Sequence, residues 1–374
     1  MEERRAIDRT KERATMETTR NIIAEIIELL NLDIPFSDIL VEQDAPVMVR
    51  GPAGWEMMGV MEIPSYDDIA VIFNALDPNW EVNILKGAIN RPMDIEPWRL
   101  RVNGYLAFSG GRLMMSIRRL PLKQPTLKAI GLSEHVRLMI DSSRGFILVA
   151  GATGSGKSTT VGAMVDCINE SRPAHVITIE DPIEYKFVRN KAIFSQREVG
   201  VDCPTFYEGV RDAMRQRPDV IVIGEIRDRE TAEAALLAAE SGHLVIATVH
   251  ANTAAGSVQK MLSFFTAADR DSKLQALSTT LVGAISQILL PHVDKQNYVL
   301  AAELLFNNKQ QCSKHLGETE KLNAWLDRKE DKISRTMIDS LEELVVSGKV
   351  SKSDALRAVT VDQPALSARL KAVT

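Results

Sequence analysis

The sequence predicts an α/β fold in which helices cover both faces of a mostly parallel sheet, with a smaller α+β domain before it and a helical region after it. From about residue 140 to residue 250, apolar runs of strand length alternate with segments of helical periodicity, which is typical of parallel sheets. Before residue 120, Gly and Pro interrupt short alternating runs, as expected of an α+β domain. The 374 residues are enough for two or three domains.

The N-terminal part divides into an arm, a small domain and a linker. Residues 1–20 carry both signs of charge and few apolar residues, which predicts a mobile arm. Residues 21–120 form the predicted α+β domain, and residues 121–135, which contain two prolines, are the predicted linker. The segments that predict the helix and strands of the small domain are 21–30, 45–50, 98–108 and 111–120.

The predicted α/β domain covers residues 136–310. Its apolar strands should be buried on both faces, and chemistry in such sheets occurs at the carboxyl ends of the strands. Helical patterning dominates after about residue 265, so residues 311–374 are predicted to form a helical C-terminal region. The expected strands are 145–150, 175–181, 219–226 and 244–250, and the expected helices are 159–170, 205–217 and 228–242.

The composition narrows the class of protein. Hydrophobic residues make up 45% and charged residues 25% of the chain, as in folded soluble proteins. The formal net charge of −5 argues against general attraction to nucleic acid, so direct nucleic-acid binding is not expected. The three cysteines form no C-x-x-C pair, which suits a reducing cytoplasm and indicates neither a disulfide framework nor a zinc site. No run reaches the roughly 20 apolar residues that span a bilayer, so we expect membrane association only through a partner.

The segment GATGSGKSTT, residues 151–160, lies between a predicted strand and a predicted helix. Glycines let such a loop curl so that its N–H groups face an anion, and the helix that follows adds the positive end of its dipole. Lys157 can reach the terminal phosphates of a nucleotide, and the Ser158 hydroxyl can bind the accompanying Mg²⁺. The pattern therefore predicts a phosphate-binding loop for ATP and Mg²⁺ rather than an ordinary Gly/Ser-rich turn. The predicted nucleotide-binding residues are Gly151, Ala152, Thr153, Gly154, Ser155, Gly156, Lys157, Ser158 and Thr159.

Polar residues end three of the predicted strands. One strand ends in Glu180 and Asp181, with Glu184 shortly after; the next two end in Glu225 and His250. Each alone could be a helix cap or a structural histidine. Beside a phosphate loop, they are the groups that Mg²⁺-dependent hydrolysis of a nucleoside triphosphate needs to hold the metal's water shell, activate water and sense the γ-phosphate.

Four blocks of the chain resemble the secretion ATPase superfamily of bacterial type II secretion, type IV pilus and type IV secretion systems. The blocks GATGSGKST, TIEDPIEY, RPDVIVIGEIRDRETAEAAL and GHLVIATVHAN are similar to that family's Walker A, aspartate box, Walker B and histidine box, in the family order. The chain is most similar to the pilus retraction ATPases and their relatives in secretion and conjugation. The resemblance implies a RecA-like P-loop NTPase core and a smaller, PAS-like N-terminal α+β domain.

The resemblance also implies roles for the acidic and histidine residues. Glu180 would be the general base and Glu225 would organise Mg²⁺ through water, although the spacing leaves open which of the two is the base. His250 would sense the γ-phosphate, and His243 would be the second histidine of the histidine box. The residues expected to support the site are Asp181, Glu184, His243 and Arg227.

Arginines crowd the two predicted strands at 98–108 and 111–120. A structural interpretation makes them solvated sheet faces. The resemblance instead implies that one or two of them reach the nucleotide and offset the charge of the transferring phosphoryl group, and their positions favour Arg101 and Arg118. The five arginines are Arg99, Arg101, Arg112, Arg118 and Arg119.

The resemblance finally implies a cytoplasmic homohexamer, peripheral at the inner membrane, that works on a platform protein to retract pili. A paralogous ATPase is a further candidate partner. The chain lacks the four-cysteine zinc insertion of many extension and secretion members, but residues 301–322 also depart from typical retraction ATPases. Pilus extension, type II or type IV secretion and conjugation therefore stay open, as do a nucleotide-binding regulatory subunit and, as a third class, a nucleic-acid helicase.

Overall fold

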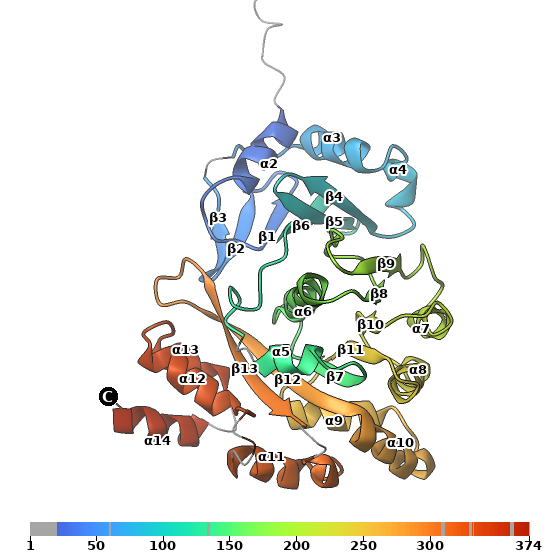
Figure 1. Ribbon diagram of the computed structural model, residues 1–374. Helices are drawn as coiled ribbons and strands as arrows, with labels where there is room; N and C mark the ends of the chain where they lie inside the picture. The colour runs from blue at the N-terminus through green and yellow to red at the C-terminus, as the bar shows by residue number, and fades with distance from the viewer. Residues whose placement is uncertain are drawn as a thin grey trace, which may run out of the picture. The chain divides into compact units, whose positions relative to one another are not determined.

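The structure is a computed structural model that describes residues 21–59, 61–132, 135–307, 311–328, 331, 333–359 and 363–373 (Figure 1). The expected charged arm, residues 1–20, lies outside the described residues. The chain divides into two compact units, the first of which ends at Pro121 while the second begins at Leu122.

The first unit contains a six-stranded antiparallel sheet in the order β3-β2-β1-β6-β5-β4. Helix α2 begins after Asn21, whose side chain accepts a hydrogen bond from the Ala24 amide, and α3 begins with a capping box between Ser65 and Asp68. This arrangement confirms the predicted α+β fold. The elements are α2 (Ile22–Leu30), β1 (Asp38–Glu42), β2 (Met48–Gly51), β3 (Gly54–Met57), α3 (Tyr66–Leu76), α4 (Trp80–Asn83), β4 (Ile89–Ile95), β5 (Trp98–Ala107) and β6 (Arg112–Pro121).

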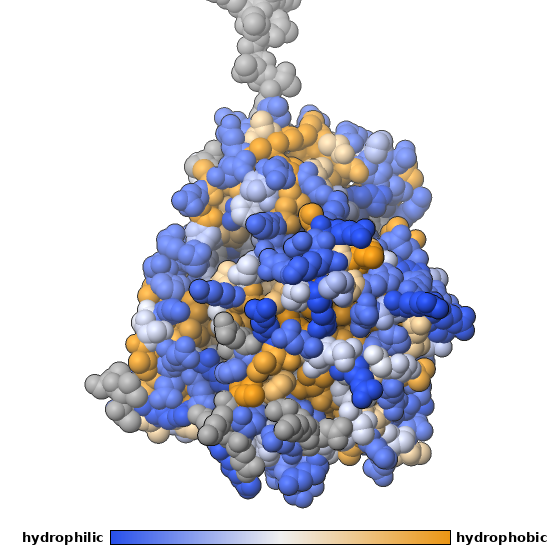
Figure 2. Space-filling model, viewed as in Figure 1, coloured by the Kyte–Doolittle hydropathy of each residue, from blue (hydrophilic) through white to orange (hydrophobic). Residues whose placement is uncertain are grey.

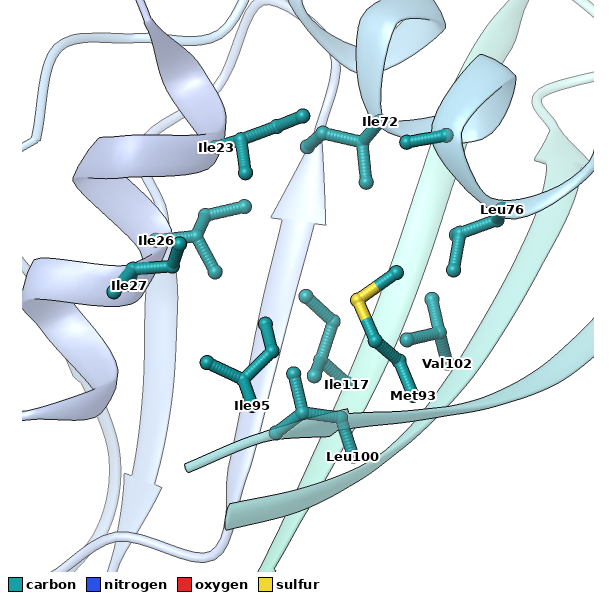
Figure 3. Close-up of a pocket in the computed structure, with 11 residues that line it drawn as sticks. Ile23, Ile26, Ile27, Ile72, Leu76, Met93, Ile95, Leu100, Val102 and Ile117 are labelled. Atoms are coloured by element: carbon teal, nitrogen blue, oxygen red, sulfur yellow. The ribbon is translucent and has the colours of Figure 1, made fainter. Parts of the chain in front are cut away.

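The core of the first unit lies between one face of this sheet and the helices α2 and α3. An apolar cavity of about 60 Å³ remains between them, and Figure 3 shows the side chains of both helices and of three strands pointing into it. Its lining is Ile23, Ile26, Ile27, Ile72, Ala75, Leu76, Met93, Ile95, Leu100, Val102 and Ile117.

Gly104 on β5 is required by the packing of the same core. A Cβ atom at this position would lie 1.9 Å from Cε1 of Phe73, and the fully buried Phe73 ring stacks on Trp80 with the ring centroids 5.0 Å apart. We expect Gly104→Ala to lower the free energy of unfolding by about 1–3 kcal/mol, measured by urea denaturation. Gly59→Ala is the control, because a Cβ there meets no atom within 4 Å; an equal loss in both variants would contradict the prediction.

The second unit contains a seven-stranded sheet in the order β13-β12-β7-β11-β10-β8-β9, in which all neighbours are parallel except the β12–β13 pair. This confirms the predicted, mostly parallel sheet. The strands are β7 (Gly145–Ala150), β8 (His175–Glu180), β9 (Ile193–Glu198), β10 (Val220–Ile223), β11 (Leu244–Val249), β12 (Leu281–Pro291) and β13 (Tyr298–Phe306).

Helices cover both faces of this sheet, as Figure 1 shows. On β7, Phe146 and Leu148 belong to one core and Ile147 and Val149 to the other, because successive side chains of a strand point to opposite faces. The first core includes residues of α7 to α11, and the second includes residues of α5 and α6. These helices are α5 (His135–Ile140), α6 (Lys157–Ser171), α7 (Phe206–Ala213), α8 (Arg229–Glu240), α9 (Ala254–Ser263), α10 (Ala267–Thr280) and α11 (Thr319–Arg328).

The prediction of helical structure after about residue 265 is wrong for residues 281–306, which form the hairpin of β12 and β13. The physical reason is that β12 is buried on both faces, with Ala284 in one core and Ile285 in the other. Such a strand shows no alternation that separates it from a buried helix. The region after the hairpin is helical as predicted, and it packs partly on the hairpin. It contains the 3₁₀ helix η2 (Ser313–His315) and, besides α11, α12 (Met337–Val346), α13 (Lys352–Ala358) and α14 (Gln363–Val373).

Hydrophilic side chains dominate the molecular face drawn in Figure 2, with smaller hydrophobic patches between them. Among the helices that the structure describes, none combines the length and apolar character needed to cross a membrane.

Candidate functional site

The strand order brings the predicted site residues to one edge of the second sheet. The phosphate loop follows β7, and the neighbouring strands β11, β10 and β8 lie beside it in that order. His250 directly follows β11, Glu225 lies two residues after β10, and Glu180 is the last residue of β8. Parallel strands end at the same edge, so these three side chains share the edge with the loop, as predicted.

The phosphate loop has a backbone that only glycines accommodate well. Gly154 and Gly156 have φ values of 78° and 86°, which is the left-handed region. A Cβ on Gly151 would lie 2.3 Å from Oγ of Ser155. These glycines allow the loop to turn directly into α6, whose first residue is Lys157, so that the free N–H groups of the helix end face the loop.

Lys157 folds back onto the loop. Its Nζ donates to the backbone carbonyls of Gly151 and Ala152, each at 2.9 Å. Burial lowers the pKa of this amine, while the charges of Glu225 and Glu184 raise it. The ammonium thus lies where it can exchange the two carbonyls for the phosphate oxygens of a bound nucleotide.

Gln287 on β12 supports the loop from behind and was not found from the sequence. This fully buried side chain donates from Nε2 to the carbonyl of Ser155 at 2.7 Å. Its Oε1 and the Ser155 hydroxyl are buried and have no hydrogen-bond partner among the described residues. A polar residue inside the apolar segment LVGAISQILLP is the one signal that could have indicated this role, because buried polar groups require partners.

Glu180 is held by two side chains that lie on its own face of the sheet. The Thr178 hydroxyl donates to its Oε1 at 2.6 Å, and Nε2 of Gln196 lies 3.3 Å from the same oxygen. Burial raises the pKa of the Glu180 carboxyl, and these two hydrogen bonds lower it. The net effect is a raised pKa for this buried carboxyl.

Glu225 lies between two cationic or potentially cationic groups. Nε2 of His250 is 3.0 Å from Oε1 of Glu225, and the Arg227 guanidinium is 2.8 Å from Oε2. Arg227 also approaches Asp181 at 3.8 Å. The hydrogen bond with Glu225 raises the pKa of Arg227. Four of the predicted residues therefore form one connected group.

His243 lies at the other edge of the sheet. It precedes β11, and its Nδ1 is 3.0 Å from the carbonyl oxygen of Ala238. His250 directly follows the same six-residue strand, so the two histidines are seven residues and about 23 Å apart at roughly 3.3 Å per residue. Within one chain, the structure does not bring His243 to the phosphate loop, and its role there stays a prediction.

Arg101 and Arg118 are direct cross-strand neighbours in the first unit. Arg118 also pairs with Asp38 of β1, and its Nε donates to Asp38 Oδ1 at 2.9 Å. Ile117 beside it belongs to the core under α2 and α3, so Arg101 and Arg118 lie on the opposite face. The sequence alone could not show this pairing, because it depends on the register of two strands.

Two other arginines of these strands are structural. Arg99 is buried and is 2.9 Å from Asp94. Arg119 is buried beside the Trp98 ring, and burial lowers its pKa to about 10. Neither residue therefore lies on a solvated face of the sheet, contrary to what the structural interpretation had expected. Arg119 donates to three backbone carbonyls, those of Leu30, Ile34 and Phe36.

A phosphate loop after the first strand of a mostly parallel sheet, with acidic residues at the ends of the neighbouring strands, defines a RecA-like P-loop NTPase fold. The model of the family described as "Type II/IV secretion system protein" matches residues 95–348, more than half of the chain. The chain belongs to this family.

Similar proteins and solved structures support this family membership. The type IV pilus ATPase PilU of Pseudomonas aeruginosa strain PAO1 is 35% identical over 259 residues, which cover 69% of this chain and 67% of PilU. A crystal structure of the pilus retraction motor PilT with bound ADP has a TM-score of 0.78 at 34% identity and covers 92% of this chain and 97% of PilT. The Legionella pneumophila ATPase DotB has a TM-score of 0.75 at 26% identity, covering 89% and 92%.

Proposed function

We propose that this chain is an ATP-hydrolysing motor that retracts type IV pili by removing pilus subunits, which produces twitching motility. The gathering of Lys157, Glu180 and Glu225 beside one phosphate loop carries the hydrolytic part of the proposal. The similarity to PilU and to the ADP-bound retraction motor PilT supports the pilus part.

The residues divide the work of hydrolysis among them. Lys157 holds the terminal phosphates, and the Glu180 carboxylate takes a proton from the attacking water. His250, which contacts Glu225, senses the γ-phosphate. The hydroxyl of Ser158 and the carboxylate of Glu225 are hard oxygen donors, which fit Mg²⁺, and Glu225 is near enough for its charge to act on Lys157. When bound with ATP, the ion would neutralise charge on the phosphates.

The motor is a homohexamer in this proposal. The Arg101–Arg118 pair supplies positive charge to a nucleotide. Closure of the domains around ATP, followed by release of phosphate, moves the subunits. The ring acts in the cytoplasm on an inner-membrane platform protein. A partner of this kind provides the membrane attachment that no described helix supplies.

Secretion or conjugation is the second candidate function. The matching family is described as "Type II/IV secretion system protein", which favours it, as does the departure of residues 301–322 from typical retraction ATPases. Of this segment, residues 301–306 are the end of β13, residues 313–315 form η2 and residues 319–322 begin α11. The same ATPase chemistry would then drive a different membrane machine.

The direction of the motor can be tested in the native host. We expect cells that carry Lys157→Ala at the chromosomal locus to accumulate static surface pili, because pilus subunits are no longer removed. Bald cells would identify an extension motor instead. An unchanged pilus number, counted by electron microscopy, would contradict the pilus proposal and favour secretion or conjugation.

A further inference from the structure

Glu180 and two neighbouring side chains share one face of the sheet. Thr178 lies two residues before Glu180 on β8, and Gln196 on β9 is the direct strand partner of Thr178. Since side chains alternate along a strand, Thr178, Glu180 and Gln196 point to the same side. Both neighbours direct a hydrogen-bond donor at Glu180 Oε1, from Thr178 Oγ1 at 2.6 Å and from Gln196 Nε2 at 3.3 Å.

The Gln196 amide is itself held at both ends. Its Nε2 donates to the carbonyl of Tyr185 at 2.7 Å, and its Oε1 accepts from the Phe187 amide at 3.0 Å. Tyr185 is buried, and its hydroxyl lies 3.1 Å from Oγ1 of Thr159. Thr159 belongs to the first turn of α6, directly after the phosphate loop. A continuous series of contacts therefore connects that loop to Glu180.

We propose that Thr178 and Gln196 are positioning residues that hold the Glu180 carboxylate in the orientation in which it activates water. This inference rests on the proposed role of Glu180 as the general base. Thr178 reaches Glu180 along its own strand, whereas Gln196 reaches it from the neighbouring strand and ties it to Tyr185. Their side chains cannot be explained by core packing alone, because an apolar residue would fill the same space without directing donors at a carboxylate.

The charged surroundings of Glu180 determine what the loss of a donor should do. The ionisable groups next to Glu180 along the chain and on the neighbouring elements are Asp181, Glu184 and Tyr185 after β8, Glu198 on β9, Glu225 and Arg227 after β10, and Lys157 at the start of α6. Among these, the Glu184 charge raises the pKa of Glu180, in the same direction as burial. Donors from Thr178 and Gln196 favour the ionised form, so their removal should shift the acidic limb of the pH profile toward higher pH.

The test is the pH dependence of ATP turnover by the full chain at saturating MgATP. Thr178→Val should shift the acidic limb upward by about one pH unit, with a loss of turnover of about tenfold below that limb. Thr178→Ser, which keeps the hydroxyl, should restore the wild-type profile. Gln196→Glu should shift the limb further, because it replaces a donor with a like charge. Ser195→Ala on the same strand is the control, since the Ser195 hydroxyl contacts His175 and not Glu180.

Two results would overturn the positioning role. One is an equal loss of turnover at every pH in Thr178→Val and Gln196→Glu, and the other is a matching loss of binding of a fluorescent ATP analogue. Wild-type turnover that persists in Glu180→Gln would instead overturn the base assignment, and the inference with it. The pH titration of the Glu180 side-chain carbon by NMR, assigned with Glu180→Gln, reads the same shift without ATP. If the variants shift the NMR-measured pKa of Glu180 but the wild-type protein shows no ATP turnover, the positioning contacts are supported and only the ATPase proposal is contradicted.

Discussion

Replacing Lys157 with alanine is expected to lower ATP turnover by about 10²- to 10³-fold, the range found when one charge-stabilising donor is removed from an active site. The Lys157 ammonium lies within hydrogen-bond distance of two loop carbonyls. It is the cation placed to follow the phosphate charge as the γ-phosphoryl group leaves. Steady-state phosphate release at saturating MgATP measures the loss.

The same variant should fold normally. Burial lowers the pKa of Lys157, so its charged form is desolvated in the folded protein and its removal spares that cost. We therefore expect an unchanged or slightly raised thermal midpoint without nucleotide. The stabilisation of about 2.7 kcal/mol that a ligand gives at 100 times its Kd should shrink in the variant. Lys128→Ala, an exposed site in the same unit, is the matched control, and full turnover in Lys157→Ala would contradict the assignment.

The parts of the fold that could be predicted are those with strong local patterns. The strand at 145–150 directly precedes the phosphate loop, and the strand at 244–250 follows Gly242. Both are short apolar runs next to a clearly predicted helix or loop. The hairpin at 281–306 was missed because its first strand is buried on both faces and follows α10 directly. The short edge strand β9 was missed because four of its six residues are polar and none of the six is fully buried.

In the candidate site too, residues in contiguous sequence motifs could be predicted, whereas contacts that depend on strand order could not. The loop residues and the strand-end groups Glu180, Glu225 and His250 are found because each lies in a short contiguous block. Gln196 and Gln287 lie on the strands that were not predicted, and their contacts depend on the strand order. The partners of Arg118 and Arg119 likewise depend on strand register. The sequence could therefore favour Arg118 by its position but could not show that Arg119 is buried against Trp98.

Replacing Glu180 with glutamine is the second change with a large expected effect. We expect turnover to fall by about 10²- to 10⁴-fold, the contribution of a positioned general base, while MgATP binding is retained. Burial raises the pKa of this carboxyl, so its charged form is disfavoured in the folded protein and stability from the neutral form is lost as pH rises through that pKa. Glutamine has no charge to desolvate, and the variant should therefore be at least as stable as the wild type at neutral pH.

Comparison with Glu225→Gln separates the two carboxylates. Loss of a residue that holds Mg²⁺ should weaken the apparent affinity of the enzyme for the ion. Higher Mg²⁺ should therefore restore part of the turnover of Glu225→Gln but none of the turnover of Glu180→Gln. The wild-type rate should fall on the acidic side at a pH above the ordinary glutamate value of about 4.3, because only the ionised Glu180 accepts a proton, and this limb should disappear in Glu180→Gln. If the limb instead persists there and disappears in Glu225→Gln, Glu225 is the base and Glu180 a supporting group.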